Sequence, residues 1–156
     1  MQLISSLFLT FTLSFGSADP ISNTVIEYHR SYRLNQAESS LNNALVELGE
    51  GINPKSFDKS WKTEGPVWVE KVKSATDVAT LSSAYLTLAE NIKPKFYKPN
   101  WEKSKEKWVK QVKEARSNLA LAGLLKTFYS NLIPETFTKE WAEKGNQWVE
   151  SLNKIE

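Results

Sequence analysis

Tryptophan recurs in this chain with a spacing of forty residues. Two series with this spacing hold all six tryptophans of the sequence: Trp61, Trp101 and Trp141 form the first series, and Trp68, Trp108 and Trp148 form the second. A fixed period in this range is the signature of a repeated structural unit. The spacing therefore restricts the chain to folds built from copies of one element.

The apolar residues around the tryptophans keep the same register. Without insertion or deletion it also relates Leu41, Leu81 and Leu121; Leu48, Leu88 and Phe128; Ile52, Ile92 and Leu132; Pro54, Pro94 and Pro134; and Phe57, Tyr97 and Phe137. Chance does not maintain such a register. We infer three copies of one unit, at residues 41–80, 81–120 and 121–156.

Each unit reads as two helices joined by a short linker. In the second unit, the apolar residues between Leu81 and Ile92 recur every three or four positions, which is the spacing of one face of a helix. Pro94 ends this helix because proline clashes with the preceding turn. A second helix is expected from Asn100, whose side chain is a good helix cap. Both tryptophans of the unit then fall in one stripe of that helix.

These patterns predict an all-α domain. A hairpin of about forty residues cannot bury two apolar stripes alone, whereas adjacent copies create a continuous core. We therefore expect one domain of three stacked αα-hairpin repeats, with the boundaries given above.

The N-terminal segment differs in composition from the repeats. Residues 1–18 form an apolar stretch that ends in small residues, as a signal peptide does, but no Lys or Arg precedes it. Two interpretations stay open: a signal peptide, or a spurious segment translated from a pyrimidine-rich intron end. The stretch is shorter than the roughly 20 residues that cross a bilayer, so no membrane span is expected. Residues 19–40 are expected to be a partly ordered lead-in to the domain at 41–156.

The tryptophans are expected to be packing residues. Both series recur in units that lack the lysine run of the second unit, so the positions of the tryptophans do not depend on the neighbouring lysines. A recurrent aromatic stripe at helical spacing normally faces the core. The first series lies near the helix start, where partial exposure is more expected, so Trp61, Trp101 and Trp141 are candidate interaction residues.

The positive charge is concentrated in the second unit. Residues 81–120 hold nine basic and four acidic side chains, a net charge of +5, whereas the chain as a whole carries +2. Lys103, Lys107 and Lys110 lie opposite the tryptophan stripe on a helical projection and are further interaction candidates. A mixed solvated face is the preferred interpretation, and weak, unspecific, salt-sensitive contact with a nucleic-acid backbone is the alternative.

The residue inventory argues against an enzyme. The chain has no cysteine and a single histidine, His29, which excludes thiolate nucleophiles and metal sites built from several cysteines or histidines. Acidic residues are scattered as surface charges, and there is no phosphate-binding glycine loop or nucleophile elbow. We therefore expect no catalytic site, no cofactor and no metal.

The second unit resembles a known family. The stretch "LTLAENIKPKFYKPNWEKSKEKWVKQVKEA" at 86–115, continued by "LALAGLL" at 119–125, is similar to a segment in the large subunit of the nucleosome remodelling factor, the bromodomain and PHD-finger transcription factor family. "YHRSYRLNQ" at 28–36 echoes a run upstream of that segment. The resemblance implies a helical scaffold of an ISWI-type chromatin remodeller. The DDT domain, PHD finger and bromodomain of the family are absent here, so only the scaffold role carries over.

Two functional hypotheses follow. The first is a non-enzymatic helical scaffold for protein interaction, related to a chromatin-remodelling subunit, with a nuclear location and a remodeller ATPase subunit as the partner that the resemblance implies. The second is a secreted helical protein that binds an apolar ligand or a foreign protein, which residues 1–18 would support. The partner itself is not encoded in any motif of the sequence.

Overall fold

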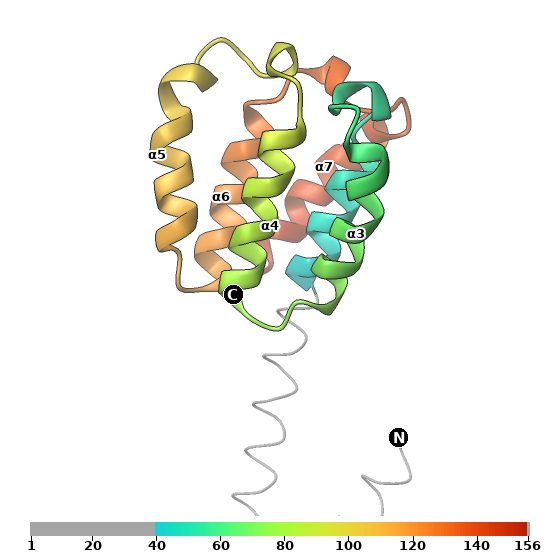
Figure 1. Ribbon diagram of the computed structural model, residues 1–156. Helices are drawn as coiled ribbons and strands as arrows, with labels where there is room; N and C mark the ends of the chain where they lie inside the picture. The colour runs from blue at the N-terminus through green and yellow to red at the C-terminus, as the bar shows by residue number, and fades with distance from the viewer. Residues whose placement is uncertain (1–39, 156) are drawn as a thin grey trace, which may run out of the picture. The chain divides into compact units, whose positions relative to one another are not determined.

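The computed structural model describes residues 40–155, and their secondary structure is helical apart from isolated bridges between linkers. Among the described residues, the first helical segment covers residues 40–51 and is called the 40–51 helix here. The elements that follow it are η1 (Pro54–Ser56), α3 (Trp61–Ser74), α4 (Val78–Asn91), η2 (Pro94–Phe96), α5 (Trp101–Glu114), α6 (Asn118–Ser130), η3 (Pro134–Thr136) and α7 (Trp141–Asn153), where η marks a short 3₁₀ helix (Figure 1). Three units of helix, 3₁₀ turn and helix repeat in the predicted register.

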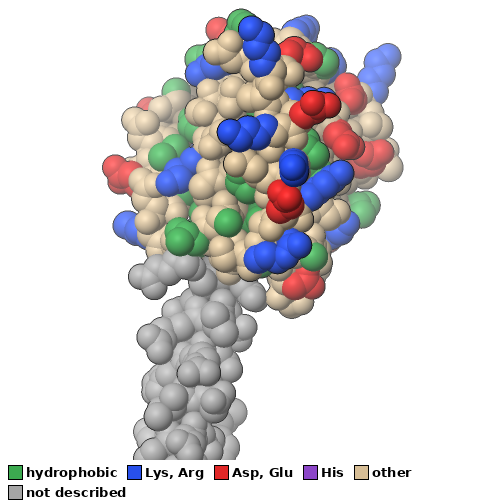
Figure 2. Space-filling model, turned by 90° about the vertical axis from the view of Figure 1, so that its left-hand side faces the viewer, with side chains coloured by type: hydrophobic (Ala, Val, Ile, Leu, Met, Phe, Trp, Pro, Cys, Tyr) green, Lys and Arg blue, Asp and Glu red, His purple; other side chains and the backbone are tan. Residues whose placement is uncertain are grey.

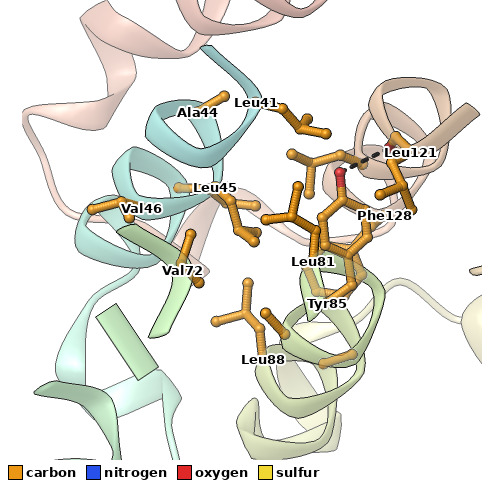
Figure 3. Close-up of a cluster of buried hydrophobic side chains, with 14 of the residues drawn as sticks. Leu41, Ala44, Leu45, Val46, Val72, Leu81, Tyr85, Leu88, Leu121 and Phe128 are labelled. Carbon is orange, nitrogen blue, oxygen red and sulfur yellow. Dashed lines mark hydrogen bonds between the residues drawn. The ribbon is translucent and has the colours of Figure 1, made fainter. Parts of the chain in front are cut away.

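Three of these helices form the centre of the domain. We call the 40–51 helix, α4 and α6 the inner helices, and α3, α5 and α7 the outer helices. Each inner helix contributes three side chains that are at most 1% exposed, in register: Leu41, Leu45 and Leu48; Leu81, Tyr85 and Leu88; Leu121, Leu125 and Phe128. Figure 3 shows side chains of all three helices converging on one cluster. Burial of this apolar surface is the main stabilising term of the fold.

The outer helices bury only one stripe each. In α5 the buried residues are Trp101, Trp108 and Val112, and the remaining surface is charged. Outer helices pack at the seams between inner helices: α5, for example, contacts both α4 and α6. The amphipathic pattern of these helices follows from this position, with one side against the core and the other in solvent.

The linkers join the three units into a closed ring. At each seam a backbone N–H of one linker donates to a backbone carbonyl of the preceding linker in the ring, and the three equivalent bonds are Lys93 to Ser56 (2.8 Å), Ile133 to Phe96 (2.9 Å) and Asn53 to Thr136 (2.8 Å). The antiparallel bridges follow the same cycle: Phe57 with Ile92, Tyr97 with Leu132, and Ile52 with Phe137. The last pair joins the third unit to the first, so the stack of hairpins has no free end among the described residues.

The helix starts differ from the expectation at Asn100. Its side chain makes no capping hydrogen bond, because the residue has helical dihedrals (φ −72°, ψ −13°). Side-chain caps occur instead at the inner helices: the Thr80 amide donates to Asp77 Oδ1 (2.7 Å), and the Ala120 amide donates to Ser117 Oγ (3.1 Å). Both cap residues are extended, as an acceptor side chain at this position requires.

The N-terminal segments for which predictions were made, 1–18 and 19–39, lie outside the described residues, as does His29. The chain divides into two units between Gln36 and Ala37, and the ring belongs to the second unit.

Candidate functional site

Aromatic side chains form the same cluster in each unit. A linker aromatic stacks on the first tryptophan of the following helix, with ring centroids 4.5 Å apart for Phe57 and Trp61, 4.9 Å for Tyr97 and Trp101, and 5.5 Å for Phe137 and Trp141. That tryptophan then lies 5.5 to 5.7 Å from the second tryptophan of its helix. These distances suit favourable offset and tilted aromatic packing. The repeated clusters are therefore part of the structural core.

The second tryptophan series links each unit to the next. The indole N–H groups donate to backbone carbonyls of the following inner helix: Trp68 to Ala84 (2.9 Å), Trp108 to Leu124 (2.9 Å) and Trp148 to Ala44 (2.7 Å). All three indoles are at most 4% exposed. The buried indole nitrogens are thus satisfied, and no part of this series is left for a ligand.

The candidate tryptophans of the first series do not share one environment. Trp101 and Trp141 are 3% and 4% exposed, so the expectation of partial exposure is wrong for both. Aromatic neighbours cover them: the ring centroids of Phe128 and Trp101 are 5.8 Å apart, and those of Tyr129 and Trp141 are 6.2 Å apart. Trp61 alone of the series is half-buried and keeps part of its surface in solvent.

The candidate lysines are all exposed on α5. Lys103, Lys107 and Lys110 lie in solvent, opposite the buried tryptophan stripe. Figure 2 shows the face that carries α5, where basic and acidic side chains stand side by side. The face is mixed in charge with a basic excess, as the sequence predicted for this helix.

An open hollow lies between α5 and α6. It has a volume of about 380 Å³, and it is lined by Gln111, Glu114 and Ala115 of α5 and by Ala120, Gly123 and Leu124 of α6. A Cβ atom placed on Gly123 would have no neighbour within 4 Å, so the absence of a side chain there keeps the hollow open. Close by, Leu119 is 60% exposed at the start of α6.

The exposed face of α6 departs from the threefold pattern. Its exposed residues are Leu119, Ala120, Gly123, Thr127 and Ser130, none of which is charged, and the partly buried Lys126 beside them donates to Asn153 Oδ1 (2.6 Å). The equivalent exposed positions carry Asn43, Glu47 and Glu50 on the 40–51 helix, and Ala79, Ser83 and Glu90 on α4, so α4 differs from α6 in charge at one position. The forty-residue repeat did not predict this face, because the repeat reveals what the units share and not where they differ. The available signal was the break in the repeat at residues 119, 120 and 123.

The titratable groups indicate structural roles. Burial raises the pKa of the Tyr85 and Tyr97 phenols, so both stay neutral and donate hydrogen bonds, to the carbonyls of Leu121 (2.9 Å) and Ala89 (2.7 Å) respectively. Hydrogen bonds from Thr80 lower the pKa of the Asp77 carboxyl. Within residues 40–155, no three His, Cys, Asp or Glu side chains gather as metal ligands would.

Across the part of the chain that the structure describes, each helix is too short or too polar to cross a lipid bilayer.

Comparison with known proteins gives one family match. Residues 78–142 match the model of a family described as "Domain of unknown function (DUF8799)". The matched segment starts at the first residue of α4 and ends at the beginning of α7, so it includes both helices that line the hollow. No curated protein and no solved structure matches the chain.

Proposed function

We propose that the domain is a non-enzymatic helical module that binds a protein partner. The observation that carries the proposal is the exposed face of α6, with Leu119 at its start and Gly123 opening onto the hollow. The equivalent faces carry exposed carboxylates, Glu47 and Glu50 on the 40–51 helix and Glu90 on α4, whereas the exposed residues of α6 carry none. An exposed leucine beside such a face favours contact with a partner.

The resemblance of residues 86–125 extends the proposal to a scaffold role in a chromatin-remodelling complex, with a remodeller ATPase subunit as partner and a nuclear location. The resembling stretch includes α5 and most of α6, so it coincides with the hollow. Weak unspecific contact with nucleic acid through Lys103, Lys107 and Lys110 remains a secondary proposal for the same helix.

Affinity capture from native cells tests the interaction role. The full chain carries a C-terminal tag, and mass spectrometry identifies the proteins that it retains at physiological salt. The matched control is the variant Leu81→Asp/Leu121→Asp, which places two carboxylates in the core and abolishes the folded surface. We expect defined partners on the wild-type chain only. Retention of the same proteins by both chains, or of none, contradicts the proposal.

The identity of the captured proteins tests the chromatin role separately. Remodeller subunits among the specific partners support it. If specific partners are found but none is a remodeller subunit, the interaction role is supported and the chromatin role is contradicted.

A secreted binding protein is the second candidate, and the composition of residues 1–18 favours it. Because the centre of the ring is filled by side chains at most 1% exposed, an apolar ligand would have to bind at the surface. Mass spectrometry of the mature N-terminus decides between the two locations. A chain that starts at Asp19 supports secretion, and a chain that retains Met1 contradicts it.

A further inference from the structure

We propose that the exposed face of α6, together with the lysines of α5 beside it, docks an acidic helical segment of the partner protein. We call this surface the α6 face and define it by Leu119, Ala120, Gly123, Lys103 and Lys107. The inference rests on the proposed function and adds the location of the binding surface and the chemistry of the partner.

The shape of the α6 face suits a helix. Ala120 and Gly123 are exposed and small, so a partner backbone can approach α6 closely, and the hollow beside them accepts a side chain. Leu119 offers an apolar contact at one end. Amphipathic helices bind such surfaces through apolar residues spaced by three and four positions.

The charge of the α6 face is positive. Gln111 and Glu114 line the hollow. Lys107 is four residues before Gln111 and so lies on the flank of α5 that faces α6, whereas Lys103, a further four residues back, points more nearly into solvent. Lys98 lies at the far end, because its backbone amide donates to the carbonyl of Asn131 just after α6 (2.7 Å). Lys107 and Lys98 thus lie along the side of α6, and Lys103 lies in solvent beside them.

Little negative charge opposes these lysines. The sequence of α6 contains no Asp or Glu, and Glu114 is the one carboxylate among the six residues that line the hollow. Of the two other glutamates of α5, Glu102 lies toward the opposite flank on a projection at 100° per residue, and Glu106 lies near the solvent-facing line, three residues after Lys103. A partner with carboxylates along one edge would therefore meet lysines and few like charges.

The two equivalent faces of the ring reject the same partner. Glu47 and Glu50 are exposed on the 40–51 helix, and Glu90 is exposed on α4. These side chains would repel an acidic helix, so electrostatics restricts docking to one of three otherwise similar surfaces. The threefold fold thereby supplies internal controls for an experiment.

The test selects ligands from a phage library of random peptides about 16 residues long, enough for a helix to run along α6 at 1.5 Å per residue. The target is the full chain, and the best peptide is then titrated by fluorescence anisotropy. Gly123→Trp fills the hollow, and Ser83→Trp places the same side chain at the equivalent exposed position of α4. Lys103→Glu/Lys107→Glu reverses the charge of both lysines of the α6 face. Lys105→Glu/Lys113→Glu makes the same charge change on the other flank of α5.

We expect selected peptides that are acidic and amphipathic. Gly123→Trp and Lys103→Glu/Lys107→Glu each weaken binding by about tenfold or more, while both control variants change it less than about twofold. Circular dichroism verifies that all four variants fold. Selection of basic or neutral peptides, no enrichment, or equal loss in the test and control variants overturns the proposal. Tighter binding of duplex DNA than of any peptide, with losses confined to Lys103→Glu/Lys107→Glu, overturns it in favour of a nucleic-acid contact.

Capture of native partners from cells distinguishes failure of the α6 face from failure of the proposed interaction function. If the wild-type chain captures specific proteins from cells and Gly123→Trp captures them equally well, the interaction module stands and the α6 face is wrong. If the folded chain captures none, the proposed function itself fails.

Discussion

The indole N–H of Trp148 donates a hydrogen bond of 2.7 Å to the backbone carbonyl of Ala44, 104 residues earlier in the chain. The equivalent bonds of Trp68 and Trp108 reach acceptors only 16 residues later. One geometry thus joins all three seams, although one seam is formed between the two ends of the described region. The bond shows that the third unit packs on the first as the first packs on the second.

A substitution of Trp148 tests the importance of this seam. Trp148→Phe removes the hydrogen bond to the Ala44 carbonyl and leaves a cavity where the larger ring packed, which together cost about 1–3 kcal/mol in the free energy of unfolding. Trp68→Phe is the matched variant, because its indole makes the same contact at the first seam. Urea denaturation should give similar losses for the two variants. A loss for Trp148→Phe below about 0.5 kcal/mol, against a normal loss for Trp68→Phe, would indicate an open stack.

Two glycines of inner helices should respond to alanine with opposite sign. A Cβ atom on Gly51 would collide with the indole ring of Trp141 across the closing seam, whereas a Cβ atom on Gly123 meets open space. Gly51→Ala should destabilise the domain by about 1–3 kcal/mol, because the indole must shift out of a well-packed site. Gly123→Ala should stabilise it by about 0.5–1 kcal/mol through helix propensity. Thermal unfolding of both variants measures the difference, and a stabilising Gly51→Ala would contradict the described packing.

Tyr85 links the stability of the domain to alkaline pH. Burial raises the pKa of its phenol above the ordinary value near 10, so the folded state holds the proton more tightly than the unfolded state. Its contribution is therefore fully present below pH 10 and is lost as the pH rises above it. Tyrosinate absorbance should show this residue ionising only with unfolding, and Tyr85→Phe should remove one late-titrating phenol. A phenol at position 85 that titrates normally in the folded protein would be inconsistent with its burial.

Ring closure also predicts that a circular permutant folds. In the forty-residue register, the position after Glu156 corresponds to Ala37, so Glu156 can be joined directly to Ala37 without a linker. A chain that runs from Thr76 to Glu156 and then from Ala37 to Ala75 opens the ring in the loop between α3 and α4 instead. We expect its helical content and melting temperature to be close to those of residues 37–156 in natural order. A permutant that remains unfolded would show that the seam between the third and first units is not equivalent to the others.

Much of this architecture could be predicted from the sequence. The forty-residue period located the units, and helical spacing identified both helices of each, because these features depend on local pattern. Closure could not be predicted in the same way, since the contacts of Gly51 with Trp141 and of Ala44 with Trp148 depend on how the units curve around one another. Repetition of a unit defines a contact between neighbours but not the rotation from one to the next.

The exposure of the first tryptophan series depends on neighbours that break the repeat. Trp101 is covered by Phe128, whereas the equivalent residue facing Trp61 is the smaller Leu88. Trp141 lies against Tyr129, whereas the corresponding residue in the first unit is Gly49. Trp61 therefore keeps partial exposure although the three tryptophans occupy one register position. Identical positions in a repeat predict the same fold, but single neighbours decide the accessible surface.

The candidate site could be predicted only in part. The basic excess identified Lys103 and Lys107, but the apolar half of the α6 face, with Leu119 and Gly123, resembles core sequence when α6 is read alone. Comparison of equivalent positions in the three units distinguishes an exposed apolar residue from a core residue, since Gly123 replaces the polar residues Asn43 and Ser83.

A nuclear Overhauser measurement on the indole N–H of Trp148 tests the closed ring most directly. In a ¹⁵N-labelled sample, the ring predicts cross-peaks from this proton to Ala44 and its neighbours in the 40–51 helix. The indole N–H protons of Trp68 and Trp108 serve as internal references, with cross-peaks to the helix segments around Ala84 and Leu124. The account is contradicted if both references show their cross-peaks and Trp148 shows none to the 40–51 helix.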